Sequence, residues 1–162
     1  MDVSQEAEML RNVPLFSGMS ASELKLLAFT SQVNCFAPGE ILMRQGDPAD
    51  CAYVILEGEA EVLARAHAGE FVVAVLGRNA VPGEIGVLTD APRTATVRAK
   101  TPLRALRISP EVFLRLASSR PDRALHVMRQ LSAHIANDLR ALAALKEELS
   151  KAQAAAAQAA TR

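Results

Sequence analysis

The sequence has few aromatic residues and no excess of either charge. Aromatic residues make up 4% of its 162 residues, with no tryptophan and one tyrosine. A platform that stacks the bases of single-stranded nucleic acid needs several aromatic side chains, so this class of site is disfavoured. The 18 basic and 18 acidic residues cancel to a formal net charge of zero. A neutral chain lacks the field that attracts nucleic acid or an anionic membrane.

Cysteine and long apolar runs are also scarce. The two cysteines, Cys35 and Cys51, do not have the spacing of metal ligands and are interpreted as small core residues. The longest apolar run is far shorter than a membrane span, and the N-terminus lacks the basic and apolar regions of a signal peptide. We therefore expect a cytoplasmic protein without membrane contact. The length predicts one domain, or one domain with an appendage.

Residues 1–31 and 32–108 differ in pattern. The first zone is helical, with a capping box at Ser20-Ala21-Ser22-Glu23 and a break at Asn12-Val13-Pro14. In the second, turn residues separate short apolar runs at even spacing, which is typical of a barrel or sandwich. A long helix between these runs is missing, so a parallel sheet is disfavoured. We predict an α+β fold: an antiparallel β-roll, or jelly-roll-like barrel, flanked by N-terminal helices and two C-terminal helices, the last one long.

Residues 109–149 return to a helical pattern. Ser109-Pro110-Glu111 predicts a capped helix start, and Arg120-Pro121 separates this helix from a longer one. The longer helix carries a coiled-coil seam that predicts a possible homodimer. Its members are Met128, Leu131, Ile135, Asp138, Leu142, Leu145 and Leu149. Asp138 either fixes the register of the seam or faces solvent. Residues 150–162 are rich in Ala and Gln and form either a helical extension or a disordered tail.

Residues 83–99 carry the groups needed to hold a small sugar phosphate. The run reads Gly-Glu-x-Gly and continues to Pro-Arg-Thr-Ala-Thr-Val. Glycine lets backbone amides approach an anion, and Arg93 offers a two-pronged donor that matches phosphate oxygens. Thr94 adds a hydroxyl, and Glu84 can accept from sugar hydroxyls. A triphosphate would need a lysine-bearing loop and a metal carboxylate, which this run lacks.

This run and several others resemble the cyclic nucleotide-binding domain family. The family includes bacterial cAMP-receptor transcription factors, regulatory domains of protein kinases A and G, and cyclic-nucleotide-gated channels. The resemblance covers roughly residues 13–145 and rests on the order and spacing of short landmarks. These landmarks are Leu15-Phe16, Phe36-Ala37-Pro38-Gly39-Glu40, Gly46-Asp47-Pro48-Ala49-Asp50, Tyr53-Val54-Ile55-Leu56-Glu57-Gly58, the run at 83–99 and Val97-Arg98-Ala99. One departure is Pro82, where many members have Phe; Asn79 can adopt the left-handed geometry of a glycine that is missing here.

The resemblance implies a cyclic nucleotide-binding domain over residues 1–145 and a set of ligand contacts. Arg93 and Thr94 would bind the cyclic phosphate, and Glu84 would bind the ribose 2′-hydroxyl. The other expected contacts are Gly83, Ile85, Gly86 and Ala95 for the phosphate, and Val62, Leu139 and Leu142 for the base or as a lid. Thr94 leaves the choice between cAMP and cGMP open. The site would hold no metal and no cofactor.

The expected function is a non-enzymatic cAMP or cGMP receptor that signals to an unknown effector by rearranging its C-terminal helices. The alternatives are a regulatory fragment of a larger transcription regulator, channel or kinase, and a ligand-independent dimerisation scaffold. A cupin-like metal enzyme is disfavoured because two of the three histidines, His126 and His134, fall on a predicted helix. Direct DNA binding is disfavoured because the sequence ends at Arg162, without room for a helix-turn-helix domain.

Overall fold

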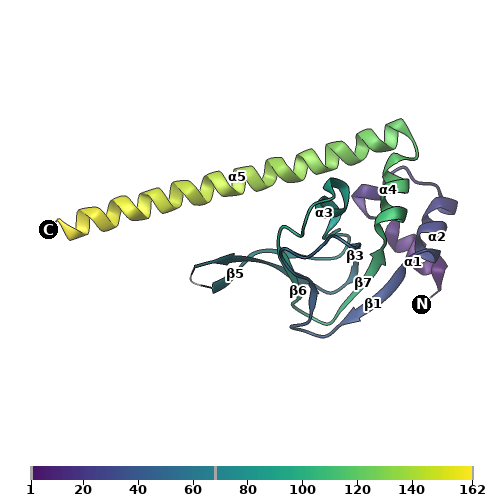
Figure 1. Ribbon diagram of the computed structural model, residues 1–162, viewed down its shortest axis with the longest axis horizontal. Helices are drawn as coiled ribbons and strands as arrows, with labels where there is room; N and C mark the ends of the chain where they lie inside the picture. Colours follow the sequence, from purple (N-terminus) through teal and green to yellow (C-terminus); the bar gives the residue numbers. More distant parts are fainter. Residues whose placement is uncertain (1, 68, 162) are drawn as a thin grey trace. The chain divides into compact units, whose positions relative to one another are not determined.

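The computed structural model describes residues 2–67 and 69–161 (Figure 1). The chain divides into two compact units, Met1–Ala124 and Leu125–Arg162. The first unit holds the described strands, the shorter helices and the first turn of the long C-terminal helix, and the second holds the rest of that helix. The glycine- and arginine-bearing run at 83–99 therefore lies wholly within the first unit.

Two short helices and a 3-10 turn come first in the chain. They are α1 (Val3–Leu10), η1 (Pro14–Phe16) and α2 (Ala21–Phe29). The predicted capping box is confirmed, because Ser20 Oγ accepts from the backbone N–H of Glu23 at 3.3 Å and the Glu23 carboxylate accepts from the backbone N–H of Ser20 at 2.8 Å. Two donors that α2 cannot satisfy internally are thereby satisfied.

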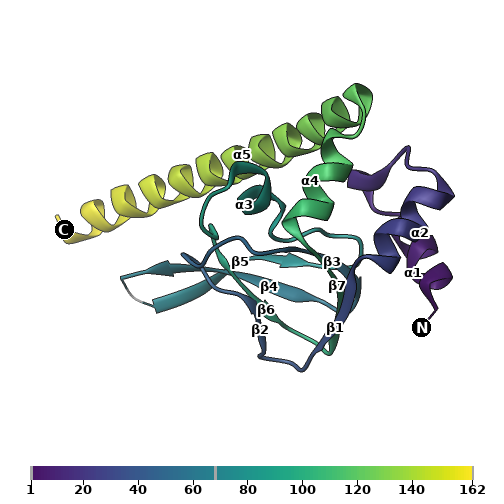
Figure 2. The ribbon, with the colours of Figure 1, turned by 45° about the vertical axis from the view of Figure 1, so that its right-hand side comes forward.

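The described residues form two antiparallel sheets (Figure 2). One has the strand order β1-β7-β3 and the other β2-β6-β4-β5. The predicted α+β fold with antiparallel strands is confirmed, although the strands form two sheets rather than one closed barrel. The strands are β1 (Gln32–Phe36), β2 (Ile41–Met43), β3 (Ala52–Glu57), β4 (Ala60–Ala66), β5 (Gly69–Leu76), β6 (Thr96–Ala99) and β7 (Leu103–Ile108).

Strand β3 is buried on both faces and contributes to two apolar clusters. Val54 and Leu56 pack into the cluster that contains Leu27 of α2, whereas Tyr53 and Ile55 pack into the cluster between the sheets. This division follows from the alternation of side chains along a strand. Burial on both faces holds β3 firmly in place, and β3 in turn fixes the end of the loop that precedes it.

Three further helices follow the strands or interrupt them. They are α3 (Glu84–Thr89), α4 (Pro110–Ser118) and α5 (Pro121–Ala160). The predicted cap of α4 is confirmed, because Ser109 Oγ accepts from the backbone N–H of Val112 at 3.4 Å. The Ala/Gln-rich segment extends α5 as a helix through Ala160, which is consistent with the high helix propensity of alanine. Asn79 has φ of 70°, the left-handed geometry expected of it.

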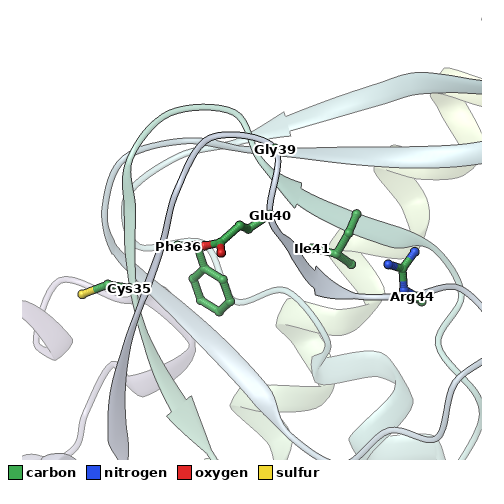
Figure 3. A pocket seen from close by; sticks show the side chains of 6 residues that line it. All are labelled: Cys35, Phe36, Gly39, Glu40, Ile41 and Arg44. Carbon is green, nitrogen blue, oxygen red and sulfur yellow. The ribbon is translucent and has the colours of Figure 1, made fainter.

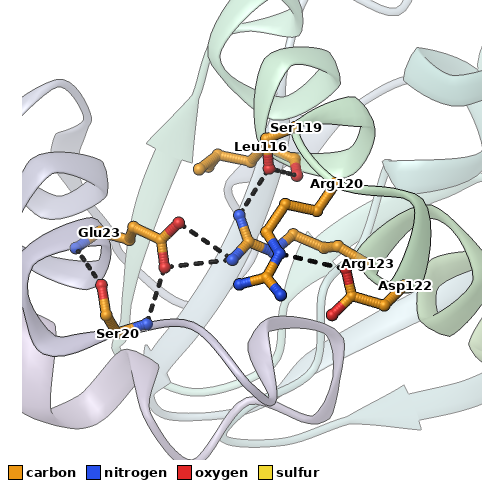
Figure 4. A network of polar contacts seen from close by, with 7 residues as sticks. All are labelled: Ser20, Glu23, Leu116, Ser119, Arg120, Asp122 and Arg123. Atoms are coloured by element: carbon orange, nitrogen blue, oxygen red, sulfur yellow. Dashed lines mark hydrogen bonds and ion pairs between the residues drawn. The ribbon is translucent and has the colours of Figure 1, made fainter.

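A polar network joins the first turn of α5 to α2, and both parts lie in the first unit (Figure 4). Nη2 of Arg123 donates to both carboxylate oxygens of Glu23, at 3.0 and 3.1 Å, and Nη1 donates to Ser119 Oγ at 2.6 Å. The Arg123 side chain is 8% exposed. The backbone hydrogen bond from Ser20 and the hydrogen bond from Arg123 lower the pKa of Glu23. One carboxylate thus caps α2 and holds the start of α5.

In the second unit, α5 carries a set of exposed large apolar side chains. They are Leu125, Met128, Ile135, Leu139, Leu142, Leu145 and Leu149. Within the predicted seam, Leu131 is half-buried and Asp138 is exposed. An amphipathic helix with such a stripe is stabilised when another apolar surface covers it. The seam stays a prediction.

Candidate functional site

Gly83 provides the tight turn that begins the candidate site. It is the N-cap of α3 and has φ of 92°, a left-handed conformation that glycine adopts without strain. A Cβ atom on Gly83 would lie 2.6 Å from Nη1 of Arg93 and 3.0 Å from Cε of Met43. Any side chain at this position would therefore displace the arginine. The glycine lets the backbone turn lie directly against the guanidinium.

Arg93 lies inside the protein and makes contacts on several sides. The residue is 4% exposed. Nη1 donates to the carbonyl oxygen of Gly83 at 3.3 Å, and Nη2 donates to Asp50 Oδ1 at 3.1 Å and to Cys51 Sγ at 3.4 Å. Because a buried cation is costly without partners, these contacts are what allow the arginine to occupy this position.

The loop between β2 and β3 also fixes the backbone of Arg93. Gly46 N–H donates to the Arg93 carbonyl at 2.9 Å, and Arg93 N–H donates to the Asp47 carbonyl at 2.8 Å. Gln45 N–H donates to Thr96 Oγ1 at 3.0 Å. The two segments therefore pair much as neighbouring strands do, and the loop holds both the main chain and the side chain of Arg93.

Asp50 lies between two arginines. Its Oδ1 accepts from Arg93, and its Oδ2 accepts from Nη2 of Arg107 on β7 at 2.9 Å. Burial by itself would raise the pKa of Asp50, but hydrogen bonds from Arg107, Cys51 and Arg93 outweigh it and lower the pKa. The carboxylate therefore stays charged and links the site to β7.

Cys51 contacts Arg93, and Tyr53 in turn forms a side-chain hydrogen bond with Cys51. Burial and the neighbouring Asp50 charge raise the pKa of the Cys51 thiol, and burial raises the pKa of Tyr53 to about 12. The Tyr53 ring meets the Phe36 ring edge to face, with centroids 5.8 Å apart. Both groups stay neutral near pH 7, so Arg93, Arg107 and Asp50 carry the charge at this place.

The structure brings some of the predicted site residues together. Gly83 and Gly86 lie beside Nη1 of Arg93, at 2.6 and 4.0 Å from the Cβ positions that an alanine would have. Glu84, in the first turn of α3, is buried at 8% exposure. The remaining predicted phosphate contacts vary in exposure: Ile85 and Ala95 are half-buried and Thr94 is exposed.

The predicted base contacts lie elsewhere in the chain. Val62 is half-buried on β4 and pairs with Val97 of β6 and Ala74 of β5. Leu139 and Leu142 lie on α5 in the second unit and are 60% and 62% exposed. The part of these three residues in ligand binding stays a prediction.

Sequence reasoning missed the partners of Arg93. The sequence marks Gly46-Asp47-Pro48-Ala49-Asp50 as a landmark without a role, and it indicates a core residue at Cys51. The structure confirms that Cys51 is buried, although its sulfur also contacts the guanidinium. The same prediction for Cys35 is wrong, because this cysteine lies on β1 and is exposed. One signal was available: Asp50 comes two residues before the largely apolar strand Ala52–Glu57, and a carboxylate there must find a cation or solvent.

Three hollows lie near the loop between β2 and β3, and one of them, of about 360 Å³, is lined by Gln45, Gly46 and Asp47 together with Arg44, Arg65, Glu70 and Thr96. A second hollow, of about 300 Å³, is lined by Arg93, Asp50, Asp47, Arg44, Pro48, Met43 and Leu42. The third, of about 520 Å³, lies at the turn between β1 and β2 and is lined by Cys35, Phe36, Gly39, Glu40, Ile41 and Arg44 (Figure 3). Of the three, only the second contains a residue that the sequence placed at the phosphate.

Clusters of metal-binding side chains and membrane-spanning helices are both absent from the part of the chain that the structure describes. Among residues 2–67 and 69–161, no three His, Cys, Asp or Glu side chains gather where they could hold a metal ion. Within the same ranges, each helix is too short or too polar to cross a membrane.

Curated proteins with similar sequences include kinase and channel proteins. The cAMP-dependent protein kinase regulatory subunit of Yarrowia lipolytica is 38% identical over 109 residues, which cover 66% of this chain and 28% of that protein. Potassium channel AKT2 of Oryza sativa is 29% identical over 126 residues, which cover 77% of this chain and 15% of that protein. This chain therefore spans about a quarter or less of the length of these relatives.

Structural comparison and the family model agree on the fold. The sensor domain of the transcriptional regulator DNR from Pseudomonas aeruginosa superposes with a TM-score of 0.75 at 24% identity, over 86% of this chain and 95% of that chain. The family model described as the cyclic nucleotide-binding domain matches residues 33–120, more than half of this chain. The chain belongs to the cyclic nucleotide-binding domain family.

Proposed function

We propose that the chain is a non-enzymatic receptor for cAMP or cGMP, with Arg93 binding the cyclic phosphate. The buried guanidinium beside the Gly83 turn is the observation that carries this proposal. A guanidinium offers five N–H donors, and the contacts described above use one on Nη1 and two on Nη2. The side chain keeps donor capacity for an anion, and it is already oriented before the ligand arrives.

The rest of the predicted set supports a nucleotide with one phosphate. Gly83, Gly86 and the first turn of α3 bring backbone amides close to the guanidinium, where they would receive phosphate oxygens. Glu84 would accept from the ribose 2′-hydroxyl, and Thr94 and Ala95 would complete the phosphate contacts. The Yarrowia relative is named as cAMP-dependent, which favours cAMP, while the exposed Thr94 leaves cGMP as the second candidate.

The signal would pass through the helices that follow β7. A nucleotide that binds one arrangement of α4 and α5 more tightly shifts the population toward that arrangement. Leu139 and Leu142 would then act as an apolar lid over the base, with Val62 on the β4 side. The output would go to an effector, either a further segment or a partner protein, as in the much longer kinase and channel relatives.

Self-association is the second part of the proposal. The predicted seam of α5 repeats at alternating steps of three and four residues from Met128 to Leu149, the spacing of a two-stranded coiled coil, and most of its members are exposed. A second copy would offer the same seam and cover it. The proposed receptor is a cytoplasmic homodimer that contacts neither DNA nor a membrane.

Calorimetric titration with cAMP, cGMP and AMP side by side tests the ligand. We expect at least one cyclic nucleotide to bind, and AMP to bind much more weakly because its phosphate is not cyclised and carries more charge. If neither cyclic nucleotide binds to the folded protein, the proposal is wrong. Equal affinities for AMP and the cyclic forms would contradict the phosphodiester site.

A further inference from the structure

The buried thiol of Cys51 contacts a charged side chain as well as the apolar core. Its sulfur is 3.4 Å from Nη2 of Arg93, the same nitrogen that donates to Asp50. Its carbonyl oxygen lies 3.2 Å from the Cβ position of Gly83. Cys51 therefore touches both the guanidinium and the turn on which the proposed phosphate site is built.

We infer that Cys51 is a positioning residue for Arg93, whose sulfur fixes the guanidinium in the orientation that receives the phosphate. This inference rests on the proposed function. It deepens that function by naming a residue that acts on the ligand through its contact with Arg93 rather than by touching the ligand. The geometry gives the thiol a part that Asp50 cannot fill by itself.

The two side-chain partners of Nη2 differ in how well they are held. The Asp50 side chain is 68% exposed and is shared with Arg107, so it can move with solvent or with β7. Cys51 is 2% exposed and directly precedes β3, which is buried on both faces. A buried group next to a fixed strand has few alternative positions, so the sulfur is the rigid partner of the arginine.

A thiol also suits this place electrically. Its pKa is raised by burial, so the sulfur stays neutral near pH 7. A neutral weak acceptor orients the guanidinium without a second negative charge that would compete with the phosphate. Asp50 supplies a negative charge beside the guanidinium, and Cys51 fixes the orientation of the guanidinium.

Two substitutions separate positioning from packing. In Cys51→Ser a hydroxyl still accepts from Arg93, whereas Cys51→Val fills the space without an acceptor. Valine suits a buried site better than serine, so packing alone ranks valine above serine in both thermal stability and nucleotide affinity. If the sulfur positions Arg93, Cys51→Ser should instead bind the nucleotide more tightly than Cys51→Val, because only serine keeps an acceptor. We expect Cys51→Val to weaken cAMP or cGMP binding by about threefold to tenfold and Cys51→Ser to stay closer to the wild type.

A double-mutant cycle with Arg93→Lys gives the second readout. Lysine keeps the positive charge but lacks the nitrogen that meets the sulfur. In that background Cys51→Val should change the affinity by less than about twofold, because the contact is already lost. Cys35→Ser, at the exposed cysteine of β1, is the matched control and should leave the affinity unchanged. If the valine variant does not fold, Cys51→Ala replaces it.

The outcomes are distinguishable. A wild type that binds neither cyclic nucleotide overturns the proposed function, and this inference with it. A wild type that binds normally overturns the inference alone in either of two cases. In the first case, Cys51→Val binds the nucleotide more tightly than Cys51→Ser, just as it is the more stable variant. In the second case, Cys51→Val lowers the affinity by the same factor whether residue 93 is arginine or lysine.

Discussion

Glu23 of α2 and Arg123 of α5 are 100 residues apart in the sequence and form an ion pair in which Nη2 of the arginine donates to both carboxylate oxygens, at 3.0 and 3.1 Å. The arginine is nearly buried, while the carboxylate is 36% exposed. The same carboxylate accepts the backbone N–H of Ser20. Loss of this one side chain would remove half of the capping box and leave the buried Arg123 with Ser119 but without a charged partner.

Glu23→Gln should therefore lower the free energy of unfolding by about 1–2 kcal/mol. Glutamine can still accept from the backbone N–H of Ser20, so the loss arises mainly because the Arg123 side chain, which is 8% exposed, loses the charge of its partner. Urea unfolding followed by circular dichroism measures the change. Glu8→Gln is the matched control, because Glu8 forms an exposed pair with Arg11 on α1 at 3.6 Å. Equal losses in both variants would contradict the special role of Glu23.

The lowered pKa values of Glu23 and Asp50 predict how the free energy of unfolding varies with pH. The pKa of Glu23 lies below its ordinary value of 4.5, and that of Asp50 lies below 3.8. A carboxylate whose pKa is lowered by folding contributes stability that is fully present above the unfolded value and is lost as the pH falls through the folded value. We expect the unfolding midpoint in urea to fall as the pH drops below about 4.5. The difference between wild type and Glu23→Gln should shrink over the same range; a constant difference down to pH 3 would argue against the linkage.

Arg93→Ala should weaken cyclic-nucleotide binding by about 2–5 kcal/mol, or about thirty- to several-thousand-fold. The bound phosphate would lose its charge partner in a buried place. Calorimetry measures the dissociation constant, and Arg78→Ala, at an exposed arginine before the Gly83 turn, serves as the control. An unchanged dissociation constant in Arg93→Ala would show that Arg93 does not bind the cyclic phosphate.

Gly83→Ala and Gly39→Ala form a matched pair. Both glycines have similar left-handed φ, 92° and 90°, so both variants should lose about 1 kcal/mol or more of stability from backbone strain. A Cβ on Gly39 would meet nothing within 4 Å, whereas one on Gly83 would press against Arg93. We expect only Gly83→Ala to weaken nucleotide binding, by about tenfold or more. Titration of both variants with the nucleotide checks this. Normal binding by Gly83→Ala would show that the turn can shift to accommodate a Cβ without displacing Arg93.

Asp138→Leu should tighten self-association if the seam of α5 pairs with a second copy. An apolar residue in place of a carboxylate at a core position favours the coiled coil, roughly by tenfold or more. Sedimentation over a range of concentrations measures the effect. Glu147→Leu is the control: it places leucine on the face of the helix opposite residue 138 and should change self-association little. Monomers at every concentration in both variants would reject the seam.

Local signals predicted much of this structure. The capping box at Ser20 and the cap at Ser109 depend on residues three positions apart, and both are confirmed. The approach of Gly83 to Arg93 also lies within one short segment. Antiparallel strands followed from turn spacing, whereas the division into two sheets depends on long-range pairing such as β3 with β7.

The partners of Arg93 could not be predicted in this way. Asp50 and Cys51 lie more than forty positions earlier, and only the pairing of the β2–β3 loop with the segment around Arg93 brings them into contact. The two alternatives for the tail were equally open, because alanine favours helix without supplying contacts that anchor it. The structure continues α5 through that segment.

Asp50 pairs with Arg93, as well as with Arg107, before any ligand arrives. A phosphodiester that binds to this arginine would meet a counterion that is part of the chain rather than one drawn from solution. Binding that depends on the release of mobile ions varies steeply with salt concentration, whereas a tethered carboxylate is present at every ionic strength. Occupancy of the module should consequently follow the concentration of its nucleotide and change little with the salt around it.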